Sequence, residues 1–175
     1  QTHPSPVPAV AVHPIDLASF WPGYDAVACR SSANNSLLIE LEPQAGSVPK
    51  CGRCGQLSPL IHERRIRLVR DRDLFDQRVL LQLPVRRVDC LHCGRVTERI
   101  DWLEPASRLT RRLRVWLESL LRLLPISHVS QLTGLHWHTL KTLDKRRLQA
   151  EVGTFDSSGV RRLVMDEFAL HKGHR

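Results

Sequence analysis

Four cysteines stand in two pairs whose spacing suits the binding of one metal ion. Cys51 and Cys54 lie in the stretch KCGRCG, and Cys90 and Cys93 lie in DCLHCG, with 35 residues between the pairs. Two thiolates two residues apart can hold a tetrahedral ion from a tight turn, and the following glycine lets backbone amides turn toward the sulfurs. The pattern predicts a four-cysteine zinc ribbon with an inserted hairpin. Because four thiolates close the coordination shell, the zinc is expected to be structural and not catalytic.

Other roles for the cysteine and histidine residues stay open at this stage. The two pairs could form disulfides or be unrelated thiols, although the reducing cytosol expected for this chain disfavours disulfides. His62 and His92 are possible substitute ligands, but His62 is better explained as a strand residue. His92 is better explained as a solvent-facing residue of the second knuckle, the tight turn between Cys90 and Cys93. The fifth cysteine, Cys29, is expected to be a free thiol.

A second group of side chains, in the stretch ISHVSQLTGLHWHTLKTLDKRRL, is typical of a helix-turn-helix. Gly134 falls at the turn, where the chain must adopt a positive φ. Leu148 continues the apolar stripe, Trp137 packs at its edge, and His136 stands where Ser or Thr would usually cap the second helix. The residues that this motif buries between its helices are Val129, Leu135, Leu140 and Leu143.

The opposite face of the second helix carries short polar and basic side chains that can reach base edges and phosphates in a major groove. These candidate DNA-binding residues are His138, Thr139, Lys141, Thr142, Lys145 and Arg146. The alternative is a plain helical hairpin with a charged exterior. Nine basic residues and only two acidic ones lie between 105 and 149, and this excess favours DNA binding.

Helical periodicity begins ahead of this motif, in TRRLRVWLESLLRLL. Thr110 or Ser107 can cap this first helix, and Pro125 ends it. A short second helix is predicted to be capped by Ser127 and ended by Gly134, and a third to run from about Trp137 to Glu151. The apolar stripe of the first helix consists of Leu113, Trp116, Leu117, Leu120, Leu121 and Leu124.

Two stretches around the cysteines predict strands. SLLIELEP reads as a strand that ends at Pro43, and QRVLLQLPVRRVDC alternates apolar side chains with others. Pro84 lacks a backbone donor, so it predicts an edge position for the second strand. At the end of the chain, RRLVMDEFALHKGHR reads as a buried strand that delivers the carboxylate of Asp166 to a site.

The charge of the chain is unevenly distributed. The 175 residues carry a net charge of +8, but residues 1–49 hold one arginine against four acidic residues. The remaining chain therefore carries a concentrated positive field, which suits a polyanion such as DNA or RNA. No apolar run reaches the roughly 18 residues that a membrane span needs, and no signal peptide is recognisable. A cytoplasmic location, nucleoid-associated when DNA is bound, is the expectation.

These elements together predict a multi-domain α+β protein. Residues 1–36, rich in Pro, Ser, Ala and Asn, are expected to be a loosely structured leader with a short helix around residues 15–20. Residues 37–104 are assigned to the zinc ribbon and 105–152 to the helix-turn-helix domain. Residues 153–175 are assigned to a linker and a first strand of a further domain.

The order of zinc ribbon, helix-turn-helix and strand resembles the transposases of bacterial insertion sequences of the ISL-three (ISL3) family. The resemblance covers residues 37 to 175 and rests on CGRCG, VRRVDCLHC, SRLTRRL, LTGLHWHTLKTLDKRRL and above all MDEFALHKGHR. It implies that the zinc ribbon and the helix-turn-helix bind the terminal inverted repeats of the element, in double-stranded DNA. Transposases usually work as dimers or larger assemblies, so a homodimer or larger assembly on DNA is the expectation.

The resemblance also gives Asp166 a role. It matches the first of three catalytic carboxylates of an RNase H-like (DDE) domain, which hold two divalent metals, Mg²⁺ or Mn²⁺, for phosphodiester transfer. The second Asp and the Glu of that set are absent here, so this chain is expected to bind DNA without cutting or joining it. Two alternatives are a non-catalytic zinc-ribbon and helix-turn-helix regulator, or a truncated transposase that competes for the DNA ends. A protein-interaction module with an acidic partner is a third.

Overall fold

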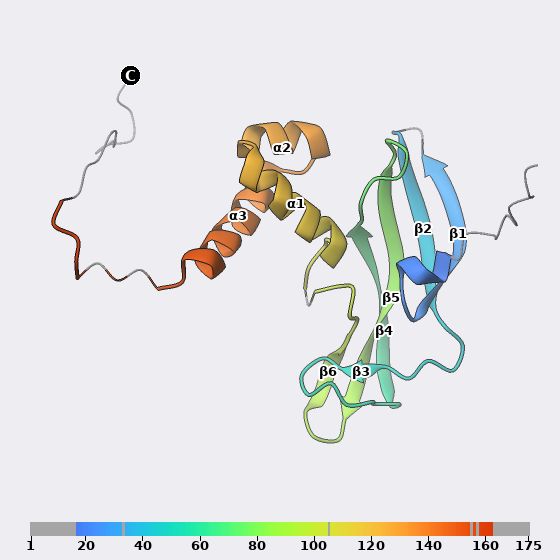
Figure 1. Ribbon diagram of the computed structural model, residues 1–175. Coiled ribbons are helices and arrows are strands. Elements are labelled where there is room, and N and C mark those ends of the chain that lie inside the picture. The colour runs from blue at the N-terminus through green and yellow to red at the C-terminus, as the bar shows by residue number, and fades with distance from the viewer. Residues whose placement is uncertain (1–16, 33, 105, 155, 157, 163–175) are drawn as a thin grey trace, which may run out of the picture. The chain divides into compact units, whose positions relative to one another are not determined.

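A computed structural model of the chain describes residues 17–162, except 33, 105, 155 and 157. Residue contacts divide the chain into two units, Gln1–Leu117 and Glu118–Arg175, and each is described by itself. Figure 1 shows the strands in the first unit and the helices mainly in the second. In chain order the elements are η1 (Leu17–Phe20, a 3-10 helix), β1 (Tyr24–Ser32), β2 (Ser36–Pro43), β3 (Lys50–Cys51), β4 (Ile61–Arg70), β5 (Arg78–Cys90), β6 (Gly94–Arg99), α1 (Arg111–Leu123), α2 (Ile126–Thr133) and α3 (Trp137–Val152).

The long strand β5 is the centre of a six-stranded sheet (Figure 1). It pairs with β4 antiparallel on one side. On its other side it pairs with β2 in parallel through its first half, and with β6 antiparallel through its last four residues. Strand β1 extends the sheet beyond β2, and β3 extends it beyond β6. The predicted strands SLLIELEP and QRVLLQLPVRRVDC are confirmed as β2 and β5.

The edge position predicted from Pro84 is wrong, because β5 lies between partners on both sides. The proline is tolerated because it sits in a gap, after β2 pairing ends at Gln82 and before β6 pairing begins at Arg87. Within this gap the Tyr24 hydroxyl donates to the Pro84 carbonyl at 3.3 Å, and the Arg86 amide donates to Glu98 Oε1 at 2.6 Å. Side chains replace a neighbouring strand there, and a missing backbone donor leaves nothing unsatisfied.

One face of the sheet forms the core of the first unit. Alternate residues are buried along β2 and along β5 as far as Val85, as the period of two along a strand requires. Burying one such aliphatic side chain contributes about 1.5–3 kcal/mol. The core consists of Trp21, Tyr24, Leu37, Ile39, Leu41, Val69, Val79, Leu81, Leu83, Val85, Ile100 and Leu103.

The loosely structured leader predicted for residues 1–36 differs from the structure between residues 17 and 32. Leu17–Phe20 form η1, close to the short helix expected there, and Tyr24–Ser32 form β1. The side chains of Trp21 and Tyr24 are buried in the core. Strand β1 was missed because alanines occupy its core-facing positions next to Tyr24, and such small side chains give a weak alternation signal. Residues 1–16 lie outside the described part of the chain.

Helix α1 begins at a cap and an ion-pair network that centre on Asp71. The hydroxyl of Thr110 accepts a hydrogen bond from the Leu113 amide at 3.3 Å, which confirms Thr110 as the helix cap. The same hydroxyl donates to Asp71 Oδ1 at 2.7 Å, and the Trp21 indole donates to Asp71 Oδ2 at 2.9 Å. Arg112 of α1 donates to the same carboxylate from its Nε at 2.7 Å. Asp71, directly after β4, therefore joins the turn between η1 and β1 to the start of α1.

The hydrogen bonds decide the charge state of Asp71. Burial alone would raise the pKa of this carboxyl, but hydrogen bonds from Arg112, Thr110 and Trp21 outweigh it and hold the pKa below its ordinary value. Asp71 is therefore a buried carboxylate with its charge compensated. No sequence pattern indicated a structural role for Asp71.

Pro125 both follows α1 and precedes α2. The second helix has Pro125 at its N-cap position, without a side-chain cap, so the predicted cap by Ser127 is wrong. The fixed φ of proline, here −57°, sets the chain for a new helix, and the amide of Val129 donates to the Pro125 carbonyl at 3.1 Å. Gly134 ends α2 with a left-handed φ of 64°, and α3 starts at Trp137, both as predicted.

Candidate metal centre and nucleic-acid interface

The four paired cysteines come together at one end of the sheet. Cys51 ends β3 and Cys54 follows in the turn, while Cys90 ends β5 and Cys93 precedes β6. Their sulfurs all lie within 4.8 Å of one another, and the Cys54 and Cys90 sulfurs are 3.6 Å apart. Tetrahedral zinc with bonds of about 2.3 Å would separate its sulfur ligands by about 3.8 Å. The donor set and its spacing fit a structural zinc ion, with no place left for a substrate.

The first knuckle is already shaped to hold a thiolate. The amides of Arg53 and Cys54 donate to the Cys51 sulfur at 3.4 and 3.5 Å. These hydrogen bonds, that from Cys54 foremost, lower the pKa of the Cys51 thiol to about 6. The turn closes through Gly55, whose left-handed φ is 77° and whose amide donates to the Cys51 carbonyl at 2.9 Å. Since zinc binds the thiolate form, this backbone prepares Cys51 as a ligand.

The Cys93 thiol of the second knuckle contrasts with the Cys51 thiol of the first. Burial, followed by hydrogen bonding with Cys54, raises the pKa of the Cys93 thiol to about 12. Four thiolates this close would repel one another, so the complete set is suited to deprotonation around a cation. Gly94 supplies the left-handed φ of 69° that turns the chain from Cys93 into β6.

Two features that the sequence analysis missed hold the first knuckle against β6. A Cβ at Gly52 would lie 2.3 Å from the Thr97 carbonyl oxygen, so only glycine fits, and its amide donates to that oxygen at 3.1 Å. Beneath it, Arg86 Nε donates to Glu98 Oε2 at 2.9 Å in a buried ion pair, and Arg86 also donates to the Ser47 carbonyl at 3.0 Å. The glycine in the stretch CGR could have indicated the close contact at Gly52. The pair of Arg86 with Glu98 becomes visible only when the pairing of β5 with β6 is known.

The other candidate ligands lie apart from the sulfurs. Among the described residues the cluster contains the four cysteines alone, without a histidine. His62 is a residue of β4, as expected, and its Nδ1 lies 3.9 Å from an oxygen of Asp89. His92 is exposed in the second knuckle, and Cys29 is an exposed free thiol on β1.

Helices α2 and α3 pack through a small apolar contact. Val129 and Leu140 are fully buried and Leu143 nearly so, as the helix-turn-helix pattern predicts, while Leu135 is half-buried. The turn between the helices is fixed by the Ser130 hydroxyl, which donates to the Leu135 carbonyl at 2.7 Å. Leu148 is 44% exposed, so the predicted extension of the stripe to this residue is wrong. The packing ends one turn earlier than the sequence period suggested.

Aromatic rings gather at the start of α3. The His136 Nδ1 accepts a hydrogen bond from the His138 amide at 3.3 Å, so His136 does cap the helix. Its ring stacks on that of His138 with centroids 5.2 Å apart, and the Trp137 ring lies 4.0 Å from His138. The ammonium of Lys141 lies 5.4 Å from the Trp137 centroid. Trp137 is 45% exposed and packs on these neighbours rather than on the apolar stripe.

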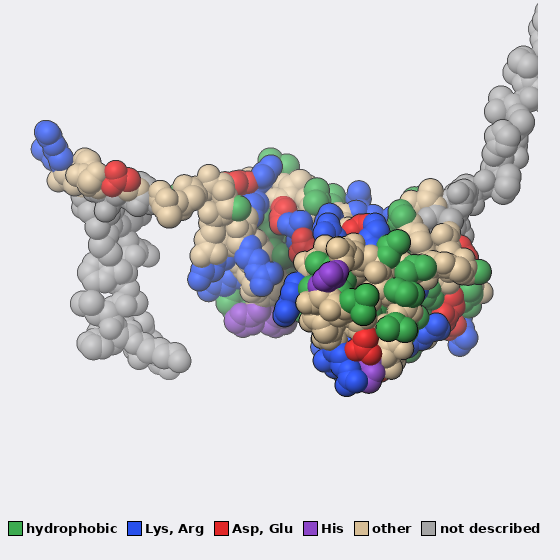
Figure 2. Space-filling model, turned by 90° about the horizontal axis from the view of Figure 1, so that it is seen from below, with side chains coloured by type: hydrophobic (Ala, Val, Ile, Leu, Met, Phe, Trp, Pro, Cys, Tyr) green, Lys and Arg blue, Asp and Glu red, His purple; other side chains and the backbone are tan. Residues whose placement is uncertain are grey.

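The outward face of α3 is open to solvent. All six candidate DNA-binding side chains are exposed: His138, Thr139, Lys141, Thr142, Lys145 and Arg146. Figure 2 shows Lys and Arg side chains with His side chains beside them on the helical unit. Lys145 and Arg146 form no ion pair within the described part of the chain, whereas Arg147 pairs with Asp144 and Glu151. The Thr142 hydroxyl donates back to the His138 carbonyl at 2.8 Å.

Two predictions fall partly or wholly outside the described residues. Asp166 and most of the strand expected over residues 161–175 belong to 163–175, of which the structure describes nothing.

Within the described residues, no helix has both the length and the apolar character that crossing a membrane requires.

Comparison with known proteins gives the same two modules in the same order. Residues 47–93 match the model for the zinc-finger of transposases IS204/IS1001/IS1096/IS1165, and residues 98–148 match the model for the helix-turn-helix domain of transposase family ISL3. The transposase for insertion sequence element IS1001 of Bordetella parapertussis is 42% identical over 158 residues. That match covers 89% of this chain and 39% of the relative. No solved structure matches the chain.

The family models overlie the two sites built above from geometry. The first spans all four cysteines, and the second spans the apolar contact of α2 and α3 together with the exposed face of α3. The resemblance drawn from the sequence is thus confirmed for both modules, and the chain belongs to the ISL3 family of transposases.

Proposed function

We propose that this chain is the DNA-recognising part of an insertion-sequence transposase, and that α3 reads the terminal inverted repeats in the major groove. The proposal rests on the face of α3, where six polar or basic side chains are exposed and Lys145 and Arg146 have no ion pair with any residue that the structure describes. A recognition helix needs such unoccupied donors, because base edges and phosphates are the partners that complete them.

The zinc ribbon has a supporting role in this proposal. Zinc held by the four cysteines would join the ends of β3, β5 and β6. Structural zinc of this kind contributes folding free energy and no chemistry. The domain limits proposed from the sequence, 37–104 for the ribbon and 105–152 for the helix-turn-helix, follow the order of the two family models.

Asp166 is proposed as a catalytic carboxylate of the whole transposase. The chain spans 39% of the length of its IS1001 relative. We infer that strand cleavage and transfer are activities of the whole transposase. In such an enzyme Mg²⁺ or Mn²⁺ held by three carboxylates would activate the attacking oxygen. In a transposase that includes this stretch, Asp166→Asn should abolish strand transfer and leave DNA binding unchanged.

The DNA-reading role is tested with the chain itself and labelled duplexes carrying the element's ends. The inverted repeat should bind roughly 10³-fold or more tightly than a shuffled duplex at the same salt concentration. Lys145→Gln with Arg146→Gln should weaken binding. Arg64→Gln with Arg78→Gln serves as the control, because both side chains are exposed and form no ion pair among the described residues. Equal affinity for all sequences, unaffected by the α3 substitutions, would show that α3 is not the reader.

A further inference from the structure

One face of the sheet changes character along its length. On the core face, Val69 of β4 lies opposite Leu81 of β5, and toward the zinc end Arg65 lies opposite Val85. The same face of β5 then continues two residues on with Arg87, which is exposed and pairs with a residue of β6. The face that buries aliphatic side chains at one end thus presents arginines at the other.

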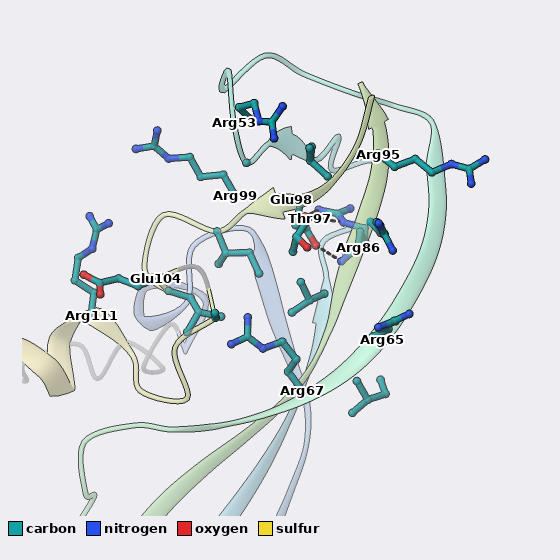
Figure 3. Close-up of a pocket in the computed structure, with 18 residues that line it drawn as sticks. Arg53, Arg65, Arg67, Arg86, Arg95, Thr97, Glu98, Arg99, Glu104 and Arg111 are labelled. Carbon is teal, nitrogen blue, oxygen red and sulfur yellow. Dashed lines mark hydrogen bonds and ion pairs between the residues drawn. The ribbon is translucent and has the colours of Figure 1, made fainter. Parts of the chain in front are cut away.

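These arginines surround a depression in the first unit, drawn in Figure 3. It has a volume of about 800 Å³, and eight arginines and two glutamates line it together with smaller residues. Figure 3 shows guanidinium groups reaching it from the first knuckle, from β4 and β6, and from the start of α1. We call its main basic residues the arginine surface, namely Arg53, Arg65, Arg67, Arg87, Arg99 and Arg111.

Much of this positive charge is not neutralised inside the protein. The buried pair of Arg86 and Glu98 forms the floor and is complete in itself. By contrast, the side chains of Arg53, Arg87 and Arg111 are exposed and make no ion pair with a carboxylate in the part of the chain that the structure describes. The ion pairs of Arg65 with Glu63 and of Arg99 with Asp101 are exposed, so they are worth little and are easily exchanged.

Arg67 shows how crowded the positive charge is. Its guanidinium donates to the Ser107 carbonyl and forms no ion pair with an acid among residues 17–162 as far as they are described. Burial, and then the like charge of Arg108, hold its pKa below the ordinary value. Cationic groups packed together in this way favour a nearby anion.

The chemistry of the surface selects the kind of anion. A guanidinium offers paired donors that match phosphate oxygens, and several of them spaced over a volume of about 800 Å³ are more than one small anion can engage. The lining residues come from strands, turns and the first residue of α1, so the depression presents no helix face that could enter a groove and read bases. A chain of regularly spaced phosphates fits both facts.

We propose that the arginine surface of the zinc ribbon holds the phosphodiester backbone of duplex DNA, adding affinity without sequence preference. The inference rests on the proposed function, because the same duplex would be read elsewhere by α3. It separates two tasks within one chain, with base recognition on α3 and backbone attachment on the sheet.

The test removes charge from the surface without touching an internal ion pair. Variant one carries Arg53→Gln, Arg87→Gln and Arg111→Gln. A matched control carries Arg64→Gln, Arg78→Gln and Arg161→Gln, which are also exposed, form no ion pair among the described residues and do not line the depression. Binding to the inverted repeat and to a shuffled duplex is measured by fluorescence anisotropy over a range of NaCl concentrations. Zinc content and thermal unfolding are followed in parallel.

Variant one should bind both duplexes at least about tenfold more weakly near 150 mM salt, and the slope of log Kd against log salt should fall by about 2–3. The ratio between the two duplexes should stay the same, and the control should change little. If variant one and the control behave alike, the arginine surface does not hold DNA, although recognition by α3 would stand. If variant one weakens binding but the Lys145 and Arg146 substitutions do not, the arginine surface stands and the proposed role of α3 is wrong.

A second measurement uses the unsubstituted chain and does not depend on how variants fold. Phenylglyoxal modification of arginines, read by mass spectrometry, should be slowed at Arg53, Arg87 and Arg111 by the duplex and unchanged at Arg64. Equal modification with and without DNA would overturn the proposal. So would protection by polyglutamate with none from DNA, since the surface would then take an acidic protein.

Discussion

The two units of this protein bury different chemistry. Besides its apolar core, the first unit buries a carboxylate at Asp71, a salt bridge between Arg86 and Glu98, and the two thiols of Cys51 and Cys90. In the second unit the contact between α2 and α3 rests on Val129, Leu140 and Leu143. Polar and metal contacts depend on direction, so the fold of the first unit depends on a few specific atoms. The packing of α2 on α3 depends on the size of the apolar side chains and on their helical spacing.

Removal of a metal ligand should have the largest effect, and only on the first unit. Cys51→Ser should lose zinc and unfold the ribbon, because structural zinc contributes about 10–16 kcal/mol of apparent binding free energy in small zinc modules. Zinc per chain is measured by mass spectrometry, and hydrogen exchange is measured segment by segment. Protection of α2 and α3 should persist. A Cys51→Ser protein with full zinc content and unchanged stability would contradict the metal assignment.

Asp71→Ala tests the polar interior away from the metal. It leaves Arg112, Trp21 and Thr110 without their shared acceptor. Each hydrogen bond to a charged group contributes about 1.5–3 kcal/mol, and the partly exposed Arg112 can turn to water, so the loss should be about 3–5 kcal/mol. Urea unfolding of the zinc-loaded chain gives this difference. A loss below about 1 kcal/mol, the range of exposed pairs, would mean that Asp71 does not hold α1 to the sheet.

Leu140→Ala tests the apolar contact of the second unit and should cost about 2–5 kcal/mol. Leu148→Ala is its control on the same helix, because that side chain is 44% exposed, and it should cost well under half as much. Both are measured by thermal unfolding monitored by helical circular dichroism. Equal losses would show that the apolar stripe does extend to Leu148, as its sequence period suggested.

Gly52→Ala adds a single methyl group where the Thr97 carbonyl leaves no room. Overpacking of this kind costs about 1–3 kcal/mol, and here the neighbour is backbone that cannot turn aside. The measurement is zinc affinity by competition with a chelator, which should fall. Gly46→Ala is not a suitable control because its φ is positive, so Gly159→Ala, with open space around it, serves that purpose.

The smallest effect concerns the start of α2. Ser127→Ala should change the free energy of unfolding by less than about 0.5 kcal/mol, since a true cap would contribute about 1 kcal/mol. Thr110→Ala should cost more than that, because its hydroxyl serves both the Leu113 amide and Asp71. If the two substitutions cost the same in urea unfolding, Ser127 caps the helix after all.

Local chemistry explains which parts of the fold could be predicted. The CxxC pairs, Gly134 and the period of α1 depend on neighbours a few residues away, and all appear in the structure as expected. Strand β1 depends on its pairing with β2, and the place of Pro84 depends on where the pairing with β2 and β6 stops. The buried acids depend on arginines 12 and 41 residues away, which a sequence pattern does not identify. Asp71 and Glu98 look like ordinary charged residues until their arginines are known. The residues of the arginine surface are scattered between 53 and 111 and gather only when β4, β5 and β6 pair.

The parallel pairing of β2 with β5 has a consequence for the order of folding. As the chain is synthesised, β1 and β2 can pair at once, but Leu37, Ile39 and Leu41 wait for β5, which ends about 50 residues later. Until then the growing chain carries an uncovered apolar edge. The zinc ligands are also completed only at Cys93, after β5 has been made. The sheet should therefore assemble late and in one step, while α2 and α3, joined by a short turn, associate quickly on their own.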